Sequence, residues 1–112
     1  MKKEELKSLL CSFRSMQAQL RYLGSEYGVH KTAFEEKEKT FRMIESALTV
    51  LDERERFIIE NHLLNHETWG ETSKKLLSHF GAEYFRSDRT LKRIQNRALE
   101  KMLTFIEDVS MF

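Results

Sequence analysis

Hydrophobic residues recur at intervals of three and four along nearly the whole chain, and this spacing places them on one face of an α-helix. The first such stretch covers residues 4–23. Its apolar positions are Leu6, Leu9, Leu10, Phe13, Met16, Leu20 and Leu23. We predict one helix there, which ends where Gly24 and Gly28 bracket a short connection.

A second helix is predicted from about residue 32 to residue 51. Its first half is highly charged, with Glu35 and Lys39 at the favourable i,i+4 spacing. Its second half carries an apolar stripe made of Phe41, Ile44, Leu48 and Leu51. Two interpretations of the charged half stay open at this point: a solvated arm, or the far side of a helical hairpin.

Three helix-start signals divide the rest of the chain. Asp52 is followed three residues later by Glu55, and Thr68 is followed by Glu71. This spacing is typical of a capping box, in which the two side chains bond each other's backbone N–H groups. Ser87 is predicted to cap the last helix, which runs to about residue 109.

The ends of the intervening helices carry signals of their own. Asn65 or His66 is predicted to end the helix that begins after Asp52, and Gly81 to end the helix that runs through Leu76. Residues 82–86 are expected to form a turn with aromatic anchors. The predicted fold class is therefore all-α, with an N-terminal helical region (1–46) followed by a helix-turn-helix region (47–112).

The last helix divides into an apolar face and a basic face. Leu91, Ile94, Ala98 and Met102 share one side, whereas Arg89, Lys92, Arg93, Asn96 and Arg97 spread over the remainder. Residues 85–104 hold six basic and two acidic side chains, while residues 51–84 hold four basic and seven acidic ones. A helix that packs on one side and offers guanidinium and amide groups on the other is typical of a DNA-reading helix.

This interpretation gives each polar residue of the segment an expected role. Asp88, Arg89, Lys92, Arg93 and Asn96 lie at the front of the helix, where base edges are reached. Ser87 and Thr90 suit phosphate contacts at a helix N-terminus. Arg97 and Lys101 are expected to contact the DNA backbone or acidic neighbours. Lys74 and Lys75, on the preceding helix, are expected to reach phosphates.

From residue 47 onward, the elements follow an order known from one family. A leucine-rich helix end and an Arg-Glu-Arg element precede an apolar helix, a short helix and a serine-capped basic helix. The positions are Leu48, Leu51, Arg54, Glu55, Arg56, Phe57, Ile58, Ile59, Trp69, Thr72, Ser73, Leu76, Ser87, Leu91, Ile94, Ala98 and Leu99. This half of the chain resembles region 4 of bacterial sigma factors.

The whole layout is also similar to the ArpU-type and related sigma-like late-gene activators of phages and prophages of Gram-positive bacteria. The resemblance implies binding near promoters, and contact with RNA polymerase through residues 47–64. It does not imply an autonomous sigma factor that melts promoters. One departure is the stretch from Leu76 to Ser87, which is longer than the family's turn by about two helical turns. Two interpretations stay open: the short helix extends to Phe80, or the connection is a loop of its own.

Composition narrows the class of protein. The 112 residues include no proline, 40% hydrophobic and 33% charged side chains, and a net charge of +1. No apolar run approaches the ~20 residues that span a bilayer, and the charged N-terminus predicts no secretory signal. The single Cys11 cannot form an internal disulfide, so we expect a cytoplasmic protein with no membrane partner.

Other chemistry-bearing residues are expected to be structural. We predict that Trp69 lies in the core, that Cys11 is a small buried hydrophobe, and that His62 and His66 are exposed rather than metal ligands. The sequence has no nucleophile elbow, phosphate-binding loop or paired-carboxylate site. We therefore expect a non-enzyme without cofactor or metal.

The function predicted from these residues is transcriptional regulation through double-stranded DNA, with RNA polymerase as a second partner. The apolar stripe of residues 6–23 has two alternative partners: the C-terminal helix of the same chain, or a second copy in a homodimer. Two alternative functions stay open. A small terminase subunit would form rings, and a sigma-like interaction module would bind polymerase without DNA.

Overall fold

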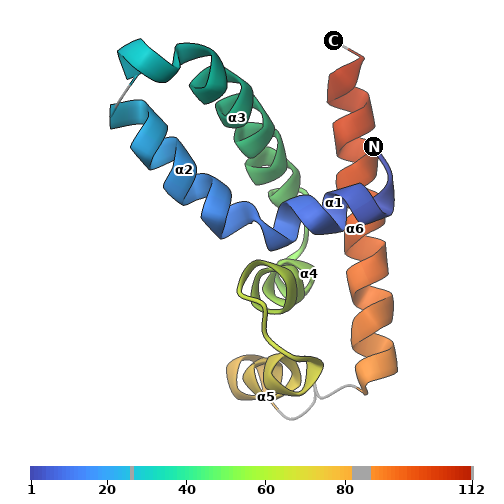
Figure 1. The fold of residues 1–112 in the computed structure, drawn as a ribbon. Coiled ribbons are helices and arrows are strands. Elements are labelled where there is room, and N and C mark those ends of the chain that lie inside the picture. The colour runs from blue at the N-terminus through green and yellow to red at the C-terminus, as the bar shows by residue number, and fades with distance from the viewer. Residues whose placement is uncertain (26, 82–86, 112) are drawn as a thin grey trace.

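The computed structural model describes residues 1–25, 27–81 and 87–111, and within these ranges every regular element is helical (Figure 1). The all-α fold class is thereby confirmed for this part of the chain. The elements are α1 (Lys3–Cys11), α2 (Phe13–Ser25), α3 (Tyr27–Leu48), α4 (Glu53–Ile58), the π-helix η1 (Ile59–Leu64), α5 (Trp69–Phe80) and α6 (Asp88–Ser110).

The long helix α6 lies along one side of the molecule, and the other helices are arranged beside it (Figure 1). The short helix α1 crosses α6 near its middle, and α4 and α5 lie beside its N-terminal half. Helices α2 and α3 form an antiparallel pair that leans away from α6. This projecting pair makes the molecule elongated, with extents of 52 × 30 × 20 Å.

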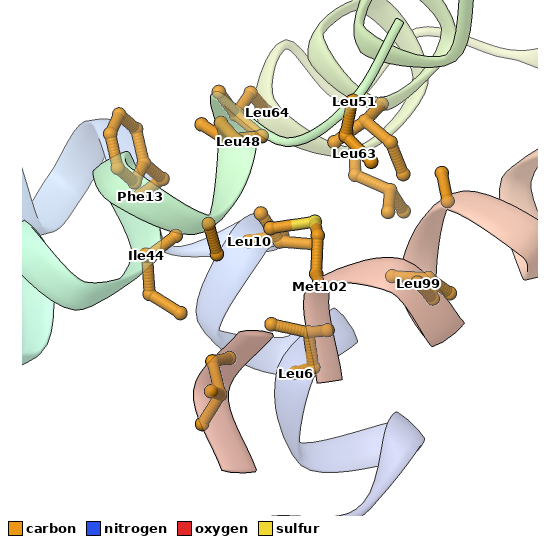
Figure 2. Packing of buried hydrophobic residues seen from close by; sticks show 14 residues of the cluster. Leu6, Leu10, Phe13, Ile44, Leu48, Leu51, Leu63, Leu64, Leu99 and Met102 are labelled. Atoms are coloured by element: carbon orange, nitrogen blue, oxygen red, sulfur yellow. The ribbon is translucent and has the colours of Figure 1, made fainter. Parts of the chain in front are cut away.

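The main hydrophobic core joins both ends of the chain. Leu6 and Leu10 of α1 are fully buried against Leu99 and Met102 of α6 and against residues of α3 and η1 (Figure 2). The remaining buried members are Phe13, Ile44, Ala47, Leu48, Leu51, Ile59, Leu63, Leu64, Ala98 and Ile106. For Leu6 and Leu10, packing on the C-terminal helix of the same chain is therefore confirmed.

The prediction of one continuous helix over residues 4–23 was wrong, because the helix breaks at Ser12. The Ser12 hydroxyl and its backbone N–H both donate to the Ser8 carbonyl, over 2.6 Å and 3.1 Å, and the break is seen in the Ser12 backbone, with φ −96° and ψ 6°. The break also serves packing. Leu10 faces the core around α6, whereas Phe13, just beyond Ser12, stacks on Phe41 of α3 with ring centroids 4.6 Å apart.

The connection predicted between Gly24 and Gly28, which separates the two predicted N-terminal helices, was also placed wrongly. Helix α2 continues through Gly24 to Ser25, and α3 begins at Tyr27 and includes Gly28. The glycines therefore lie inside helices, and the irregular backbone of α3 falls at His30, with φ −113° and ψ 28°. Of the two interpretations of the charged stretch, the helical hairpin is the observed one (Figure 1).

The capping box at Asp52 is confirmed and begins α4. The Asp52 carboxylate accepts from the Glu55 N–H over 2.7 Å, and the Asp52 N–H donates to the Glu55 carboxylate over 3.0 Å. The helix then widens into η1, a π-helix that the sequence pattern did not predict. It ends at Asn65, as expected, and His66 takes a positive φ of 57°.

A second, smaller hydrophobic cluster holds α4, α5 and α6 together. Its buried members are Ile58, Leu76, Leu91 and Ile94, with Phe57, Trp69 and Phe80 packed around them. Helix α5 extends to Phe80, and Gly81 closes it as predicted, with φ 99° and a 2.9 Å hydrogen bond to the Leu77 carbonyl. The long stretch after Leu76 is therefore partly helix. The predicted turn at 82–86 lies outside the described residues.

Among the helices that the structure describes, none combines the length and the apolar character needed to cross a membrane.

Shortening Leu10 to alanine tests whether α1 stabilises the C-terminal part. We expect Leu10→Ala to lower the free energy of unfolding by about 2–5 kcal/mol, because a fully buried leucine leaves a cavity. Circular dichroism and Trp69 fluorescence should report the same transition. The matched control is Leu77→Ala on the exposed side of α5, with an expected loss of under about 0.5 kcal/mol. Equal losses in both variants would contradict the packing.

Candidate nucleic-acid interface

Helix α6 begins at a serine cap, as predicted. The Ser87 side chain accepts from the Thr90 backbone N–H over 3.4 Å, and Asp88 is the acidic residue of the first turn. A short hydroxyl side chain suits this position because it satisfies a backbone N–H that has no partner within the helix. The N-terminal end of α6 is therefore marked by a contact within its own first turn.

Beyond the cap, α6 has a buried face and an exposed face. Leu91, Ala98, Leu99 and Met102 are completely buried, and Ile94 nearly so. The residues predicted to contact DNA are exposed, apart from the half-buried Thr90. We call Arg89, Lys92, Arg93, Asn96 and Arg97 the basic row. No side chain of this row has an ion pair or a hydrogen bond with residues 1–25, 27–81 or 87–111.

The two lysines predicted on α5 differ from each other. Both are exposed, but Lys75 forms an ion pair with Glu67, whereas Lys74 has no ion-pair partner in the described part of the chain. Nearby, hydrogen bonds from the Thr68 side chain and backbone lower the pKa of Glu71. Of these two lysines, Lys74 can bind a phosphate directly, whereas Lys75 would first have to break its ion pair with Glu67.

Lys101 binds a carboxylate instead of pointing into solvent. Its ammonium group contacts the nearly buried Glu55 carboxylate over 2.8 Å. The same carboxylate completes the capping box of α4, so one acidic group joins the start of α4 to the middle of α6. The expectation that Lys101 contacts an acidic neighbour is confirmed.

His62 stacks on Trp69, with ring centroids 3.6 Å apart and planes inclined by 20°. His62 Nδ1 donates to the Glu67 carbonyl over 2.8 Å, because a carbonyl oxygen can only accept. The predicted exposure of His62 was wrong, since η1 turns it toward α5, while His66 is exposed as expected. Trp69 is half-buried against the second cluster, so its predicted core role is confirmed only in part.

The environment of His62 disfavours its charged form. Burial lowers the pKa of His62 below its ordinary value of 6.5, the positive charges of Lys7 and Lys92 lower it further, and the hydrogen bond to Glu67 opposes them. Within the described ranges, no group of three His, Cys, Asp or Glu residues could hold a metal ion.

A cavity of about 300 Å³ adjoins the basic row. It lies between α1, η1, α5 and α6 and is lined by Lys7, Cys11, His62, Leu63, Trp69, Lys92, Gln95 and Asn96. Cys11 is exposed, so its predicted role as a buried hydrophobe was wrong. Lys7 and Gln95 were not predicted to belong to a site, because no local pattern connects residue 7 with residue 95.

Lowering the pH should destabilise the fold through His62. Since its pKa is lower in the folded protein than in the unfolded chain, its contribution is complete above about pH 6.5 and is lost on acidification. We expect the free energy of unfolding, measured by urea titration between about pH 7 and pH 5, to fall less in His62→Phe than in the wild type. Ser15→Ala, an exposed substitution on α2, should keep the wild-type slope, and the same slope in His62→Phe would contradict the assignment.

Comparison with protein-family models, with curated proteins and with solved structures finds no match to this chain. The resemblance to sigma region 4 is therefore supported by the residues of the C-terminal half alone. The candidate interface is supported by the exposure and position of the basic row on α6.

Proposed function

We propose that the protein is a DNA-binding transcriptional regulator in which α5 and α6 act as a helix-turn-helix and the first turns of α6 enter the major groove. The supporting observation is the basic row. These side chains are exposed and unpaired within the described residues, on a helix whose opposite face is buried. A buried apolar face opposite an exposed basic face suits a helix that must be held rigidly and still reach base edges.

The two hydrophobic clusters divide α6 into two parts. Leu91 and Ile94, near its start, pack on α4 and α5, whereas Ala98, Leu99, Met102 and Ile106 pack in the main core. The helix spans about 35 Å at 1.5 Å per residue, so its first ten residues cover about 15 Å, comparable with a major groove ~12 Å wide. In this proposal the first part reads DNA and the second part anchors the helix.

The side chains of the basic row have the chemistry for base and phosphate contacts. Arg89 and Arg93 are one helical turn apart, and an arginine fork can bind guanine O6 and N7. Asn96 can pair with adenine N6 and N7, and Asp88 can accept from cytosine N4. Lys92 and Lys74 suit phosphates, as does the N-terminus of α6 at Ser87 and Thr90.

The regulatory part of the proposal derives from the resemblance to sigma region 4 and to phage late-gene activators. Contact with RNA polymerase would involve residues 47–64. In this stretch most apolar side chains are buried, while Glu53 and Arg56 are exposed. A polymerase contact there would therefore be polar.

A two-fold complex on DNA would need dimer contacts outside α1. Leu6 and Leu10 are fully buried in the core of their own chain, so they are not available to a second copy. The α2–α3 pair projects from the rest of the molecule and exposes Tyr22 and Val29, so a homodimer through the N-terminal helices would use this pair (Figure 1).

Removing two arginines of the basic row tests DNA binding. We expect Arg89→Ala with Arg93→Ala to weaken binding to a selected duplex by about 1–3 kcal/mol for each lost base contact. The salt dependence of log K should change by less than about one, because both arginines are assigned to base edges and not to phosphates. Fluorescence anisotropy at several salt concentrations measures both quantities, using a duplex selected from random sequences by the wild type.

The matched control removes two arginines from the α2–α3 pair, Arg21→Ala with Arg42→Ala. Both side chains are exposed, and the net charge changes by the same amount. The control should keep the wild-type affinity. Equal losses in the two double variants would indicate nonspecific charge attraction, and unchanged binding in the Arg89 and Arg93 variant would refute the proposed reading helix.

A further inference from the structure

The cavity beside α6 combines several groups that bind anions. Its polar lining comes from four separate elements: Lys7 and Cys11 from α1, His62 from η1, Trp69 from α5, and Lys92, Gln95 and Asn96 from α6. Among the residues that the structure describes, no aspartate or glutamate belongs to this lining. At about 300 Å³ the cavity is at the lower end of the range for ligand pockets.

Gln95 is the buried polar group of this lining. The residue is 5% exposed, and its Oε1 atom has no hydrogen-bond partner among the described residues. A buried amide without a partner is unfavourable, so native proteins normally satisfy it with protein, water or a ligand. Because a glutamine amide can be turned over, its NH₂ group can occupy the same place and donate to an anion.

Two cationic side chains reach the same cavity without being neutralised. Lys7 is half-buried and Lys92 is exposed, and neither forms an ion pair within the described part of the chain. Both nevertheless act on His62, whose pKa they help to lower. The part of the lining that the described residues form is therefore positively charged.

We propose that this cavity binds a phosphate group, which Lys7 and Lys92 hold by charge and the Gln95 and Asn96 amides hold by hydrogen bonds. Ammonium groups and amide NH₂ groups are all donors, and a phosphate is rich in acceptor oxygens. His62 and Trp69 form the wall beside it. Neither Lys7 nor Gln95 is needed for the DNA contacts proposed above.

Two kinds of ligand would supply a phosphate group to this cavity: a DNA backbone, or a free phosphate or nucleotide. Lys92 and Asn96 belong both to the cavity and to the basic row, so a backbone phosphate of a duplex lying along α6 is one source. This source rests on the proposed function, and it makes Lys7 of α1 an additional backbone contact. The other source is a free phosphate or nucleotide, which requires no DNA binding.

Nuclear magnetic resonance on the full chain tests the site with two probes, inorganic phosphate and a mixed-sequence duplex, each against sodium chloride of equal ionic strength. Phosphate should cause saturable shifts of the Trp69 indole and Gln95 amide signals. It should also raise the pKa of His62, since an anion favours the imidazolium. The absence of saturable shifts at both signals with both probes overturns the proposal.

Substitution of Lys7 tests whether its ammonium group binds the phosphate. Lys7→Met keeps the aliphatic stem and should weaken phosphate binding at least about fivefold, as expected for one charge-assisted contact. Lys31→Met on α3 is the matched control and should have no effect, because Lys31 is exposed and outside the cavity lining. Equal phosphate affinity of Lys7→Met and the wild type overturns the assignment.

The unsubstituted protein gives a second measurement. Cys11 is the only cysteine and lines the cavity, so bound phosphate should slow its alkylation by iodoacetamide. An unchanged alkylation rate at saturating phosphate counts against the site. This readout does not depend on whether Lys7→Met folds.

Measuring the duplex affinity of the same variants distinguishes a DNA backbone phosphate from a free phosphate. Weaker duplex binding by Lys7→Met, with normal binding by Lys31→Met, supports a backbone phosphate in the cavity. Phosphate binding with unchanged duplex affinity supports a free phosphate. If the wild type binds no DNA, the proposed function fails, while the phosphate titration still tests the cavity.

Discussion

The burial of one face of α6 in two successive hydrophobic clusters is the constraint on which the rest of the structure depends. The second, smaller cluster, around Leu91 and Ile94, holds the start of the helix against α4 and α5. The main core, around Leu99 and Met102, holds its later turns against α1, α3 and η1. With the apolar face occupied along most of its length, α6 can leave its cationic side chains in solvent without losing its position.

The break at Ser12 connects this packing to the proposed phosphate site. Because α1 ends at Cys11, it can cross α6 while α2 turns away to pair with α3. The crossing is held by the buried Leu6 and Leu10. The His66 ring, just beyond η1, donates to the Cys11 carbonyl over 2.5 Å and so ties the end of α1 to the segment after η1. Lys7 lies on the same short helix, so the contacts that build the core also bring its charge to Lys92 and Asn96.

The π-helix η1 positions a residue of the cavity wall, His62, as the break at Ser12 positions Lys7. Its wider turn belongs to the segment that presents His62 to Trp69 while Leu63 and Leu64 stay in the core. The Glu55 carboxylate, shared by the cap of α4 and by Lys101, joins α4, which leads directly into η1, to α6. The walls of the cavity therefore come from elements that are tied together by separate contacts.

Local sequence patterns were sufficient to predict the helical class, the caps at Asp52, Thr68 and Ser87, and the two faces of α6. These features depend on residues three or four positions apart, whose geometry a helix already defines. The break at Ser12, the exposure of Cys11, and the meeting of Lys7 with Gln95 depended on which helices pack together. Only the tertiary structure decided them, because contacts between distant residues form no repeating spacing along the chain.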